Sequence, residues 1–498
     1  MKPIIFIIVL GMLYRDARSQ GLYKAAFEGQ GVLTGRKDVP FWMRSNQYGS
    51  IPLAGATGSV IGTAMKTYDS SWSGLTDWGG GIELRGDVGN GSRLTLIEGY
   101  LKARVSIFEI KAGRTKDFMG LVDSTLSSGA FSLSGNALGI PKVDISIPNY
   151  FTLPVFRGLF SFKGNFAHGW LGEQAVIPNN LVREANTWFH QVSLYGRLGR
   201  PDWKLHLYGG VNHQVYWGSE KSIYGKNWGL SQVQTFEYVM LGRTYKGTKV
   251  GNHLGSIDLG LDYNFGSVSL RVYRQNFYDE GALYKLANIL DGLNGISIVN
   301  TDDADTEPDY FPVQHHNSGD YEGFHWHKIV LEVFASKNQA GYPWSRRTAS
   351  GDENYYNNNS YPSGWSYKGL GLGNPFITPF PSTRSNLPND TTDFFNNNRV
   401  IALYGGLEGS YGGYRFTAKA SYSMNYGTFG TSPWGHSTGN HYYPPKYGLF
   451  PKVNQFSAYL SAERDLDWHW TAGVVAALDK GGLFYNSTGL IFRIKRWL

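Results

Sequence analysis

Apolar and polar side chains alternate along many short segments of the chain, and the clearest segment is 413–425. Its even positions, from Tyr414 to Met424, carry apolar or small side chains, whereas its odd positions are polar and include Arg415 and Lys419. Successive side chains of a strand point to opposite faces, so this period of two predicts a strand with one apolar and one polar face. The same pattern recurs at 203–208, 257–263, 268–273, 454–464 and 488–498.

The alternating segments predict an all-β fold, a transmembrane antiparallel β-barrel of about 18 strands. A strand that is apolar on one face and polar on the other suits a wall between lipid and a wet interior, and such bacterial barrels have an even number of strands. Because 57–67 and 141–147 alternate less clearly, about 16 strands is the alternative. The predicted strands are 22–35, 57–67, 79–88, 94–104, 107–115, 141–147, 158–168, 186–198, 203–217, 252–263, 267–276, 293–300, 325–335, 398–408, 413–425, 454–464, 470–479 and 488–498.

The lengths of the connections predict the orientation of this barrel. Bacterial barrels place short turns in the periplasm and long loops outside the cell. Long irregular segments occupy 218–251, 336–397 and 427–453, whereas the connections at the other end, such as 199–202, are short. The mature N-terminus is therefore expected in the periplasm.

Three segments do not fit a plain up-and-down barrel. Residues 116–140 and 277–292 lack the alternation, and we expect them to form short helices or inward loops that plug or constrict the lumen, with surface loops as the alternative. The acidic stretch 301–324 falls on the periplasmic side, where turns should be short. Either this stretch is an insertion or 293–300 is not a strand.

Composition supports a barrel and argues against a soluble enzyme. Aromatic residues make up 15% and charged residues 17% of the chain, which also contains 64 glycines and no cysteine, whereas soluble domains carry about 25% charged residues. A mean hydropathy of −0.31 excludes a helical membrane protein. The net charge of +7 leaves open an acidic partner, although charges lining a lumen explain it equally simply.

The N-terminus predicts export. Lys2 precedes an apolar run at 3–14, and Ala17 and Ser19 are the small residues that a signal peptidase recognises. We expect residues 1–19 to be a cleaved signal peptide and 20–498 to be one barrel in the outer membrane of a Gram-negative cell. A membrane anchor is the alternative, but the run is shorter than the roughly 20 apolar residues that span a bilayer.

A series of short motifs runs in order through the mature chain. They are SGNALGIPK (134–142), YGGVNHQVYWG (208–218), GNHLGSIDLGLDY (251–263), LDGLNGI (290–296), LEVFASKNQ (331–339) and DENYYNNNSYPSGWSYKGLGLGNPF (352–376). Together they resemble the Wzi-type capsule assembly proteins. The resemblance implies an 18-stranded barrel with a helical plug that holds capsular polysaccharide at the cell surface; the stretch 301–324 departs from the family pattern.

The segment 342–376 is the strongest candidate for ligand binding. It interleaves aromatic rings with asparagines, and rings cover the C–H faces of sugars while amides pair with hydroxyl groups. Alternatively, the rings pack the loop onto the barrel mouth. The candidate glycan-binding residues are Tyr342, Trp344, Tyr355, Tyr356, Tyr361, Trp365, Tyr367, Asn354 and Asn357.

A second candidate, 213–217, lies at the upper end of a strand. Trp217 shares the parity of lipid-facing Leu205 and Leu207, so it is expected to face lipid unless a bulge at Gly209 and Gly210 reverses the faces.

No metal, cofactor or catalytic site is expected. Asp303, Asp305, Glu307 and Asp309 alternate as in a calcium loop, but Pro308 stands where that loop needs glycine. His325 and His327 lack an evident third ligand for zinc, and the chain has no G-x-S-x-G elbow.

We therefore expect a lectin-like, non-catalytic barrel that attaches surface polysaccharide, with a diffusion porin or polysaccharide export channel as the alternative and a barrel enzyme as a third hypothesis. The expected partners are capsular or other surface polysaccharide, outer-membrane lipid and the barrel-assembly machinery. We expect no nucleic acid and a monomer.

Overall fold

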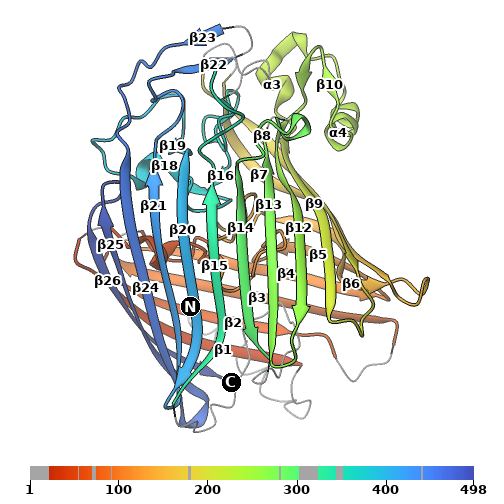
Figure 1. Ribbon diagram of the computed structural model, residues 1–498, viewed down its shortest axis with the longest axis vertical. Helices are drawn as coiled ribbons and strands as arrows, with labels where there is room; N and C mark the ends of the chain where they lie inside the picture. The colour runs from red at the N-terminus through yellow and green to blue at the C-terminus, as the bar shows by residue number, and fades with distance from the viewer. Residues whose placement is uncertain are drawn as a thin grey trace, which may run out of the picture.

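The computed structural model describes residues 22–498, except 37, 54, 70–73, 91, 178–180, 280–281, 302–322, 344–351 and 439–440. Eighteen long antiparallel strands close into one barrel (Figure 1). Each long strand pairs with the next along the chain, and the ring closes where Ala26 pairs with Trp497. The strands are β1 (Tyr23–Thr34), β2 (Thr57–Lys66), β3 (Thr76–Gly89), β4 (Arg93–Val105), β5 (Phe108–Arg114), β6 (Lys142–Thr152), β7 (Phe160–Val176), β8 (Arg183–Leu198), β9 (Leu205–Trp217), β12 (Asn252–Asn264), β13 (Val268–Tyr278), β14 (Gly292–Asn300), β15 (Phe324–Ala335), β20 (Val400–Tyr411), β21 (Tyr414–Asn425), β24 (Val453–Leu466), β25 (Trp470–Gly481) and β26 (Ser487–Trp497).

Each segment predicted as a strand coincides with one of these strands. The weakly alternating segments 57–67 and 141–147 are β2 and β6, so the alternative of 16 strands is wrong. The segment 293–300 is also a strand, β14. The acidic stretch 301–324 therefore begins directly after β14 and ends at the first residue of β15, and its residues 302–322 lie outside the described part of the chain.

The two faces of the strands separate as the alternation predicts. On β24, Leu460 is 50% exposed on the outer face, whereas its neighbour Ser461 is buried on the inner face. On β21, Tyr414 and Tyr422 are exposed, whereas Ser421 and Ser423 are buried. A closed ring pairs its own backbone groups and presents apolar side chains outward, so the chain is a transmembrane β-barrel of the outer-membrane class.

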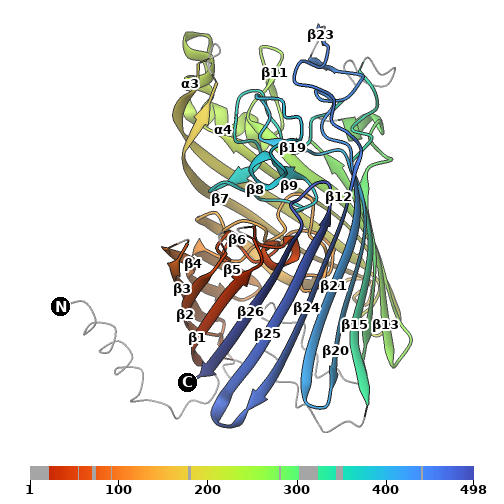
Figure 2. The same ribbon diagram turned by 90° about the vertical axis from the view of Figure 1, so that its left-hand side faces the viewer.

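The long connections gather at one end of the barrel, and the short turns gather at the other. The beginning of β1 and the C-terminus lie at the end with short turns, which is the periplasmic end (Figure 2). The signal peptide predicted at 1–19 lies outside the described residues. Among the described helices, none is long and apolar enough to span a membrane.

Short elements occupy the extracellular connections. They are the helices α2 (Phe41–Arg44), α3 (Glu220–Tyr224) and α4 (Gln232–Met240), the 3-10 turns η1 (Gly225–Asn227), η2 (Ala282–Lys285) and η3 (Phe380–Ser382), and four strand pairs. The pairs are β10 (Thr244–Tyr245) with β11 (Thr248–Lys249), β16 (Ser366–Tyr367) with β17 (Leu370–Gly371), β18 (Thr378–Pro379) with β19 (Phe395–Asn397), and β22 (His436–Thr438) with β23 (His441–Tyr443).

Placing a cation on the outer face of a strand tests which face meets the lipid. Leu460→Arg places a guanidinium among acyl chains in the middle of β24, and we expect the free energy of unfolding to fall by about 2–4 kcal/mol. Thr417→Arg is the matched control, because Thr417 faces inward on β21 and pairs with Glu408. Urea-induced unfolding in phospholipid vesicles measures both variants, and equal losses would contradict the assignment of the two faces.

Candidate functional site

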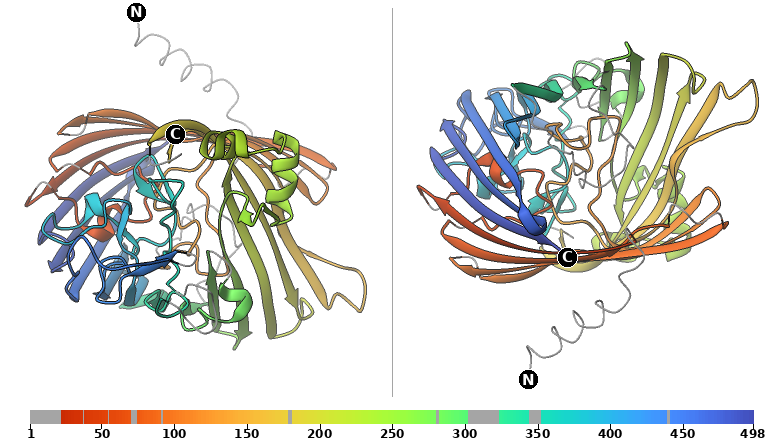
Figure 3. Two further views of the ribbon diagram at one scale, coloured as in Figure 1. Left: turned by 90° about the horizontal axis from the view of Figure 1, so that it is seen from above. Right: turned by 90° about the horizontal axis from the view of Figure 1, so that it is seen from below.

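Residues 116–140 lie inside the barrel, where inward-facing polar side chains of the wall hold them. Glu332 of β15 accepts a hydrogen bond from the backbone amide of Ser128 at 2.7 Å. Asp258 of β12 accepts one from the amide of Leu121 at 3.1 Å. The segment plugs the lumen as predicted (Figure 3), but it contains no helix, because several of its backbone amides bond to the wall instead of to their own chain.

The second predicted plug segment, 277–292, is only partly helical. Its first residues belong to β13, and η2 forms a single 3-10 turn in its middle. Both of its ends contribute to the interior: Phe277 is fully buried at the start of the segment and stacks on Phe131 of the plug with ring centroids 4.0 Å apart. Asn288 and Asp291 are both buried, and they contact the long segment between β15 and β20.

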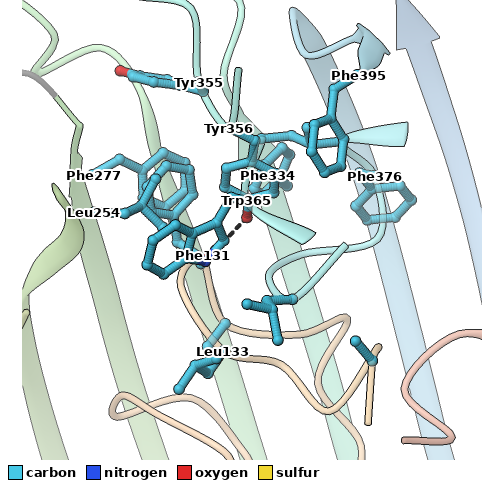
Figure 4. Packing of buried hydrophobic residues seen from close by; sticks show 14 of the residues in the cluster. Phe131, Leu133, Leu254, Phe277, Phe334, Tyr355, Tyr356, Trp365, Phe376 and Phe395 are labelled. Atoms are coloured by element: carbon cyan, nitrogen blue, oxygen red, sulfur yellow. Dashed lines mark hydrogen bonds between the residues drawn. The ribbon is translucent and has the colours of Figure 1, made fainter. Parts of the chain in front are cut away.

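That long segment also folds into the barrel and forms an aromatic core with the plug (Figure 4). Trp365 is fully buried, and its indole Nε1 donates to the carbonyl of Ser132 at 2.9 Å. The same indole stacks on Tyr216 of β9 with ring centroids 4.3 Å apart. The hydroxyl of Tyr356 bonds to the carbonyl of Phe131. The extracellular half of the lumen is therefore filled by packed rings.

This core changes the interpretation of the predicted glycan-binding residues. The five aromatic side chains that are predicted to bind sugar but lie buried in the core are Tyr355, Tyr356, Tyr361, Trp365 and Tyr367. A side chain without exposed surface cannot contact a polymer outside the cell. The prediction of a surface binding loop is wrong for these residues, and the alternative, in which the rings pack the loop into the barrel mouth, is confirmed for them.

The two asparagines also serve the packing of the loop. Asn357 is buried, and its amide donates to the carbonyl of Phe395 at 2.9 Å. The amide of Asn354 donates to Asp393 at 3.0 Å. Tyr342 is 56% exposed and remains a candidate for glycan contact. Trp344 lies outside the described residues.

The second predicted candidate, 213–217, faces outward and inward at the predicted positions, but its outward side chains contact another part of the chain and not lipid. No register shift occurs in the pairing of β9, so Trp217 faces outward as expected. It is nevertheless buried, because the segment 218–251 folds back over the outer wall and Phe236 of α4 packs on the indole at 5.0 Å. We call the segment 218–251 the outer arm. The prediction that Trp217 contacts lipid is therefore wrong.

Asp291, which directly precedes β14, fastens the segment between β15 and β20 to the end of the segment 277–292. Its carboxylate accepts hydrogen bonds from the backbone amides of Asn338 at 2.8 Å and Gln339 at 2.6 Å, and from the hydroxyl of Tyr355 at 2.9 Å. Burial raises the pKa of Asp291 to about 6, although these donors and the Arg399 guanidinium oppose the shift.

An exposed aromatic surface lies above the core. Trp434, Tyr442, Tyr443 and Tyr447 belong to the connection between β21 and β24, and all four side chains are exposed. Tyr342 lies against Trp434 with ring centroids 4.6 Å apart. We call these five residues the aromatic surface.

The aromatic surface is anchored to the interior of the barrel and carries a basic bias. Asp352, which is buried, accepts hydrogen bonds from the amide and hydroxyl of Ser437 on β22 at 2.9 Å and 2.6 Å. The connection 426–452 contains Lys446 and Lys452 but no carboxylic acid. The lengths of the connections predict 427–453 as an extracellular loop, but they do not single out its rings, because the exposure of those rings depends on tertiary packing.

Metal chemistry has little support in the described part of the chain, where no group of three or more histidine, aspartate or glutamate residues could hold an ion. The acidic residues Asp303 to Asp309 lie outside the described residues. His327 contacts Ser410 at 3.0 Å on the barrel wall.

No protein-family model and no curated protein matches the chain. Solved structures similar to it include the outer membrane protein OprD of Pseudomonas aeruginosa, with 10% identity, a TM-score of 0.45, and coverage of 97% of this chain and 96% of that chain. OccAB2 of Acinetobacter baumannii has 11% identity, a TM-score of 0.44 and coverage of 96% and 98%. OmpT of Vibrio cholerae has 9% identity, a TM-score of 0.34 and coverage of 96% and 98%.

Truncating the central ring of the core tests its role in holding the plug. We expect Trp365→Ala to lower stability by about 3–5 kcal/mol, since it removes a fully buried ring and leaves a cavity. Tyr342→Ala removes an exposed ring and should change stability little. Limited proteolysis of 352–397 in the folded barrel measures the effect, and equal resistance of the two variants would contradict the packing.

The raised pKa of Asp291 predicts that the attachment of the segment between β15 and β20 depends on pH. This raised pKa means that the folded protein keeps a proton that the unfolded chain releases between about pH 4 and pH 6. The attachment of the segment between β15 and β20 at Asp291 should therefore weaken as the pH rises through that window. Hydrogen exchange at 338–341, corrected for intrinsic rates, should show this weakening in the wild type and a smaller one in Asp291→Asn. An identical pH profile in the variant would assign the effect to another group.

Proposed function

We propose that the protein attaches a surface polysaccharide to the outer membrane without catalysing a reaction on it. The barrel anchors the chain in the membrane, and the aromatic surface contacts the polymer outside the cell. The observation that carries the proposal is the filled extracellular lumen: two inward segments close the interior with buried rings, while other rings remain exposed above them. Exposed rings at the top of a closed barrel suit binding at the outer face better than passage through the wall.

The chemistry of the aromatic surface fits a carbohydrate. Tyrosine and tryptophan rings cover the C–H faces of sugar rings, and their O–H and N–H groups pair with hydroxyls. A polymer with repeating units can contact several such rings at once, so weak contacts add through multivalency. The resemblance of the motifs between 134 and 376 to capsule assembly proteins supports capsular polysaccharide as the polymer.

A diffusion porin or export channel is the second candidate, and the periplasmic half of the lumen favours it. The inner wall there carries partly exposed ion pairs, such as Arg271 with Asp262 at 2.7 Å and Arg415 with Glu463 at 3.8 Å. A charged, wet wall is typical of barrels that conduct solutes. Transport through this barrel requires the plug and the aromatic core to move.

A polysaccharide retention assay tests the proposed function. In a strain that lacks the gene, we expect the fraction of polysaccharide bound to cells to fall and the shed fraction to rise, and the wild-type gene should restore retention. The triple variant Trp434→Ala, Tyr442→Ala and Tyr443→Ala should restore it only in part. Each lost ring contributes about 0.5–1.5 kcal/mol, so binding should weaken roughly tenfold or more.

The matched control removes the same kinds of ring from the periplasmic turns. Tyr411, Tyr414 and Trp468 are exposed at that end, and their replacement by alanine should leave retention unchanged. Conductance of the purified wild-type barrel in a planar bilayer decides between the two candidates. A large, stable open-channel current together with unaltered retention in the deletion strain would favour the transport function.

A further inference from the structure

The outer arm lies on the outside of the barrel wall. Trp217 and Val215 on β9 have the outward parity of the exposed Val211, yet the arm covers both of them. Phe236 of α4 also packs on His168 and His190, with ring centroids 5.5 Å away in each case. On the inner face of the same strand, Tyr216 joins the aromatic core. The arm and the plug therefore occupy opposite faces of one wall.

The side of α4 that faces away from the barrel is partly apolar. Thr235 and Val239 are buried toward the wall, whereas Val233 is 80% exposed. Met240 and Leu241 are also exposed at the C-terminal end of the helix. Three exposed apolar side chains on a short helix at the rim of a transmembrane wall are what an interfacial helix presents to the boundary between acyl chains and headgroups.

The arm also carries exposed cations, among them Lys226, Arg243 and Lys246. Arg243 lies three residues after the end of α4. Lys246 donates to the carbonyl of Asn227 at 3.0 Å, which places the exposed Lys226, the residue before Asn227, in the same part of the arm. The arm contains five lysine and arginine residues and two glutamates. Glu237 pairs with Arg243 at 3.1 Å, and burial raises the pKa of Glu220 to about 7, which reduces its negative charge.

The position of the arm along the barrel axis matches that of the lipid headgroups in the outer leaflet. It occupies the extracellular end of the barrel, next to the ends of β8 and β9 (Figure 1). Lower on the same outer faces, Leu194, Val211 and Ile257 are exposed and belong to the lipid-facing belt. The basic and apolar side chains of the arm thus sit directly above that belt.

We propose that the outer arm binds the phosphorylated headgroup of a glycolipid in the outer leaflet. Lys226, Arg243 and Lys246 contact the phosphate groups, and Val233 and Leu241 contact the upper parts of the acyl chains. This binding holds α4 against the wall. It is independent of the polysaccharide function, because it uses none of the residues of the aromatic surface.

The test uses the full-length barrel in phosphatidylcholine nanodiscs and lipid A as the probe. We expect the triple variant Lys226→Gln, Arg243→Gln and Lys246→Gln to bind lipid A on the order of 10-fold to 100-fold more weakly, at roughly 1 kcal/mol for each cation near an anionic surface. The control variant Lys368→Gln, Lys446→Gln and Lys452→Gln loses the same charge from other exposed extracellular positions and should bind within about twofold of the wild type. Heat-modifiable gel migration verifies that both variants are folded.

Two further measurements separate the lipid from other sources of the effect. Val233→Ser with Leu241→Ser should weaken binding several-fold while all cations remain, and dephosphorylated lipid A should bind weakly to the wild type. An equal loss of lipid A affinity in the triple and control variants would mean that net charge, and not the outer arm, causes the loss, which would contradict the proposal. Unchanged binding in the triple variant, or full displacement of lipid A by millimolar inorganic phosphate, would overturn the proposal.

Discussion

The need to pair every backbone polar group within the membrane governs this structure. A hydrocarbon layer offers no partner to a free N–H or C=O, so strands can cross it only as a closed ring. Closure between β1 and β26 meets this requirement and leaves the side chains free to differ between the two faces. The inner face can then be polar, and its carboxylates and amides become available to hold other parts of the chain. Glu332 and Asp258 do this for the plug, at 2.7 Å and 3.1 Å from the amides of Ser128 and Leu121.

Strand β9 packs against other parts of the chain on both its inner and its outer face. Tyr216 points inward and stacks on Trp365, whereas the adjacent Trp217 points outward and packs under Phe236. The period of two places neighbouring rings on opposite faces without any bulge. A register slip of one residue in β9 would exchange these rings and dismantle the aromatic core and the outer arm together. The extracellular end of this strand is therefore constrained by packing on both faces, unlike the lower wall, which meets lipid on one side and water on the other.

The sequence predicts the wall well because its signal is local. Alternation along 413–425 or 454–464 reports directly which residues share a face, and the structure confirms both strands and their parity. The segments that leave the wall follow long-range contacts instead. The plug is irregular because the wall supplies its hydrogen-bond partners, and no local pattern reveals that. The rings of 352–376 have the same sequence pattern whether they face solvent or a lumen. The sequence therefore predicts a binding surface at Trp365, although this side chain lies at the centre of the core.

The free energy needed to move the inward segments out of the lumen helps to decide between attachment and transport. Moving the segment between β15 and β20 out of the barrel would expose Trp365, Tyr355 and Tyr356, and each large side chain contributes about 1.5–3 kcal/mol through burial alone. It would also leave Asp291 without the donors that it has in the closed barrel, and moving the plug as well would remove the Ser127 and Ser128 donors from Glu332. An open state would then be rare unless a ligand or partner bound it much more tightly than the closed state, since a ligand shifts an equilibrium only by its differential affinity. Binding at the aromatic surface needs no such rearrangement, because its rings are already exposed above the closed core.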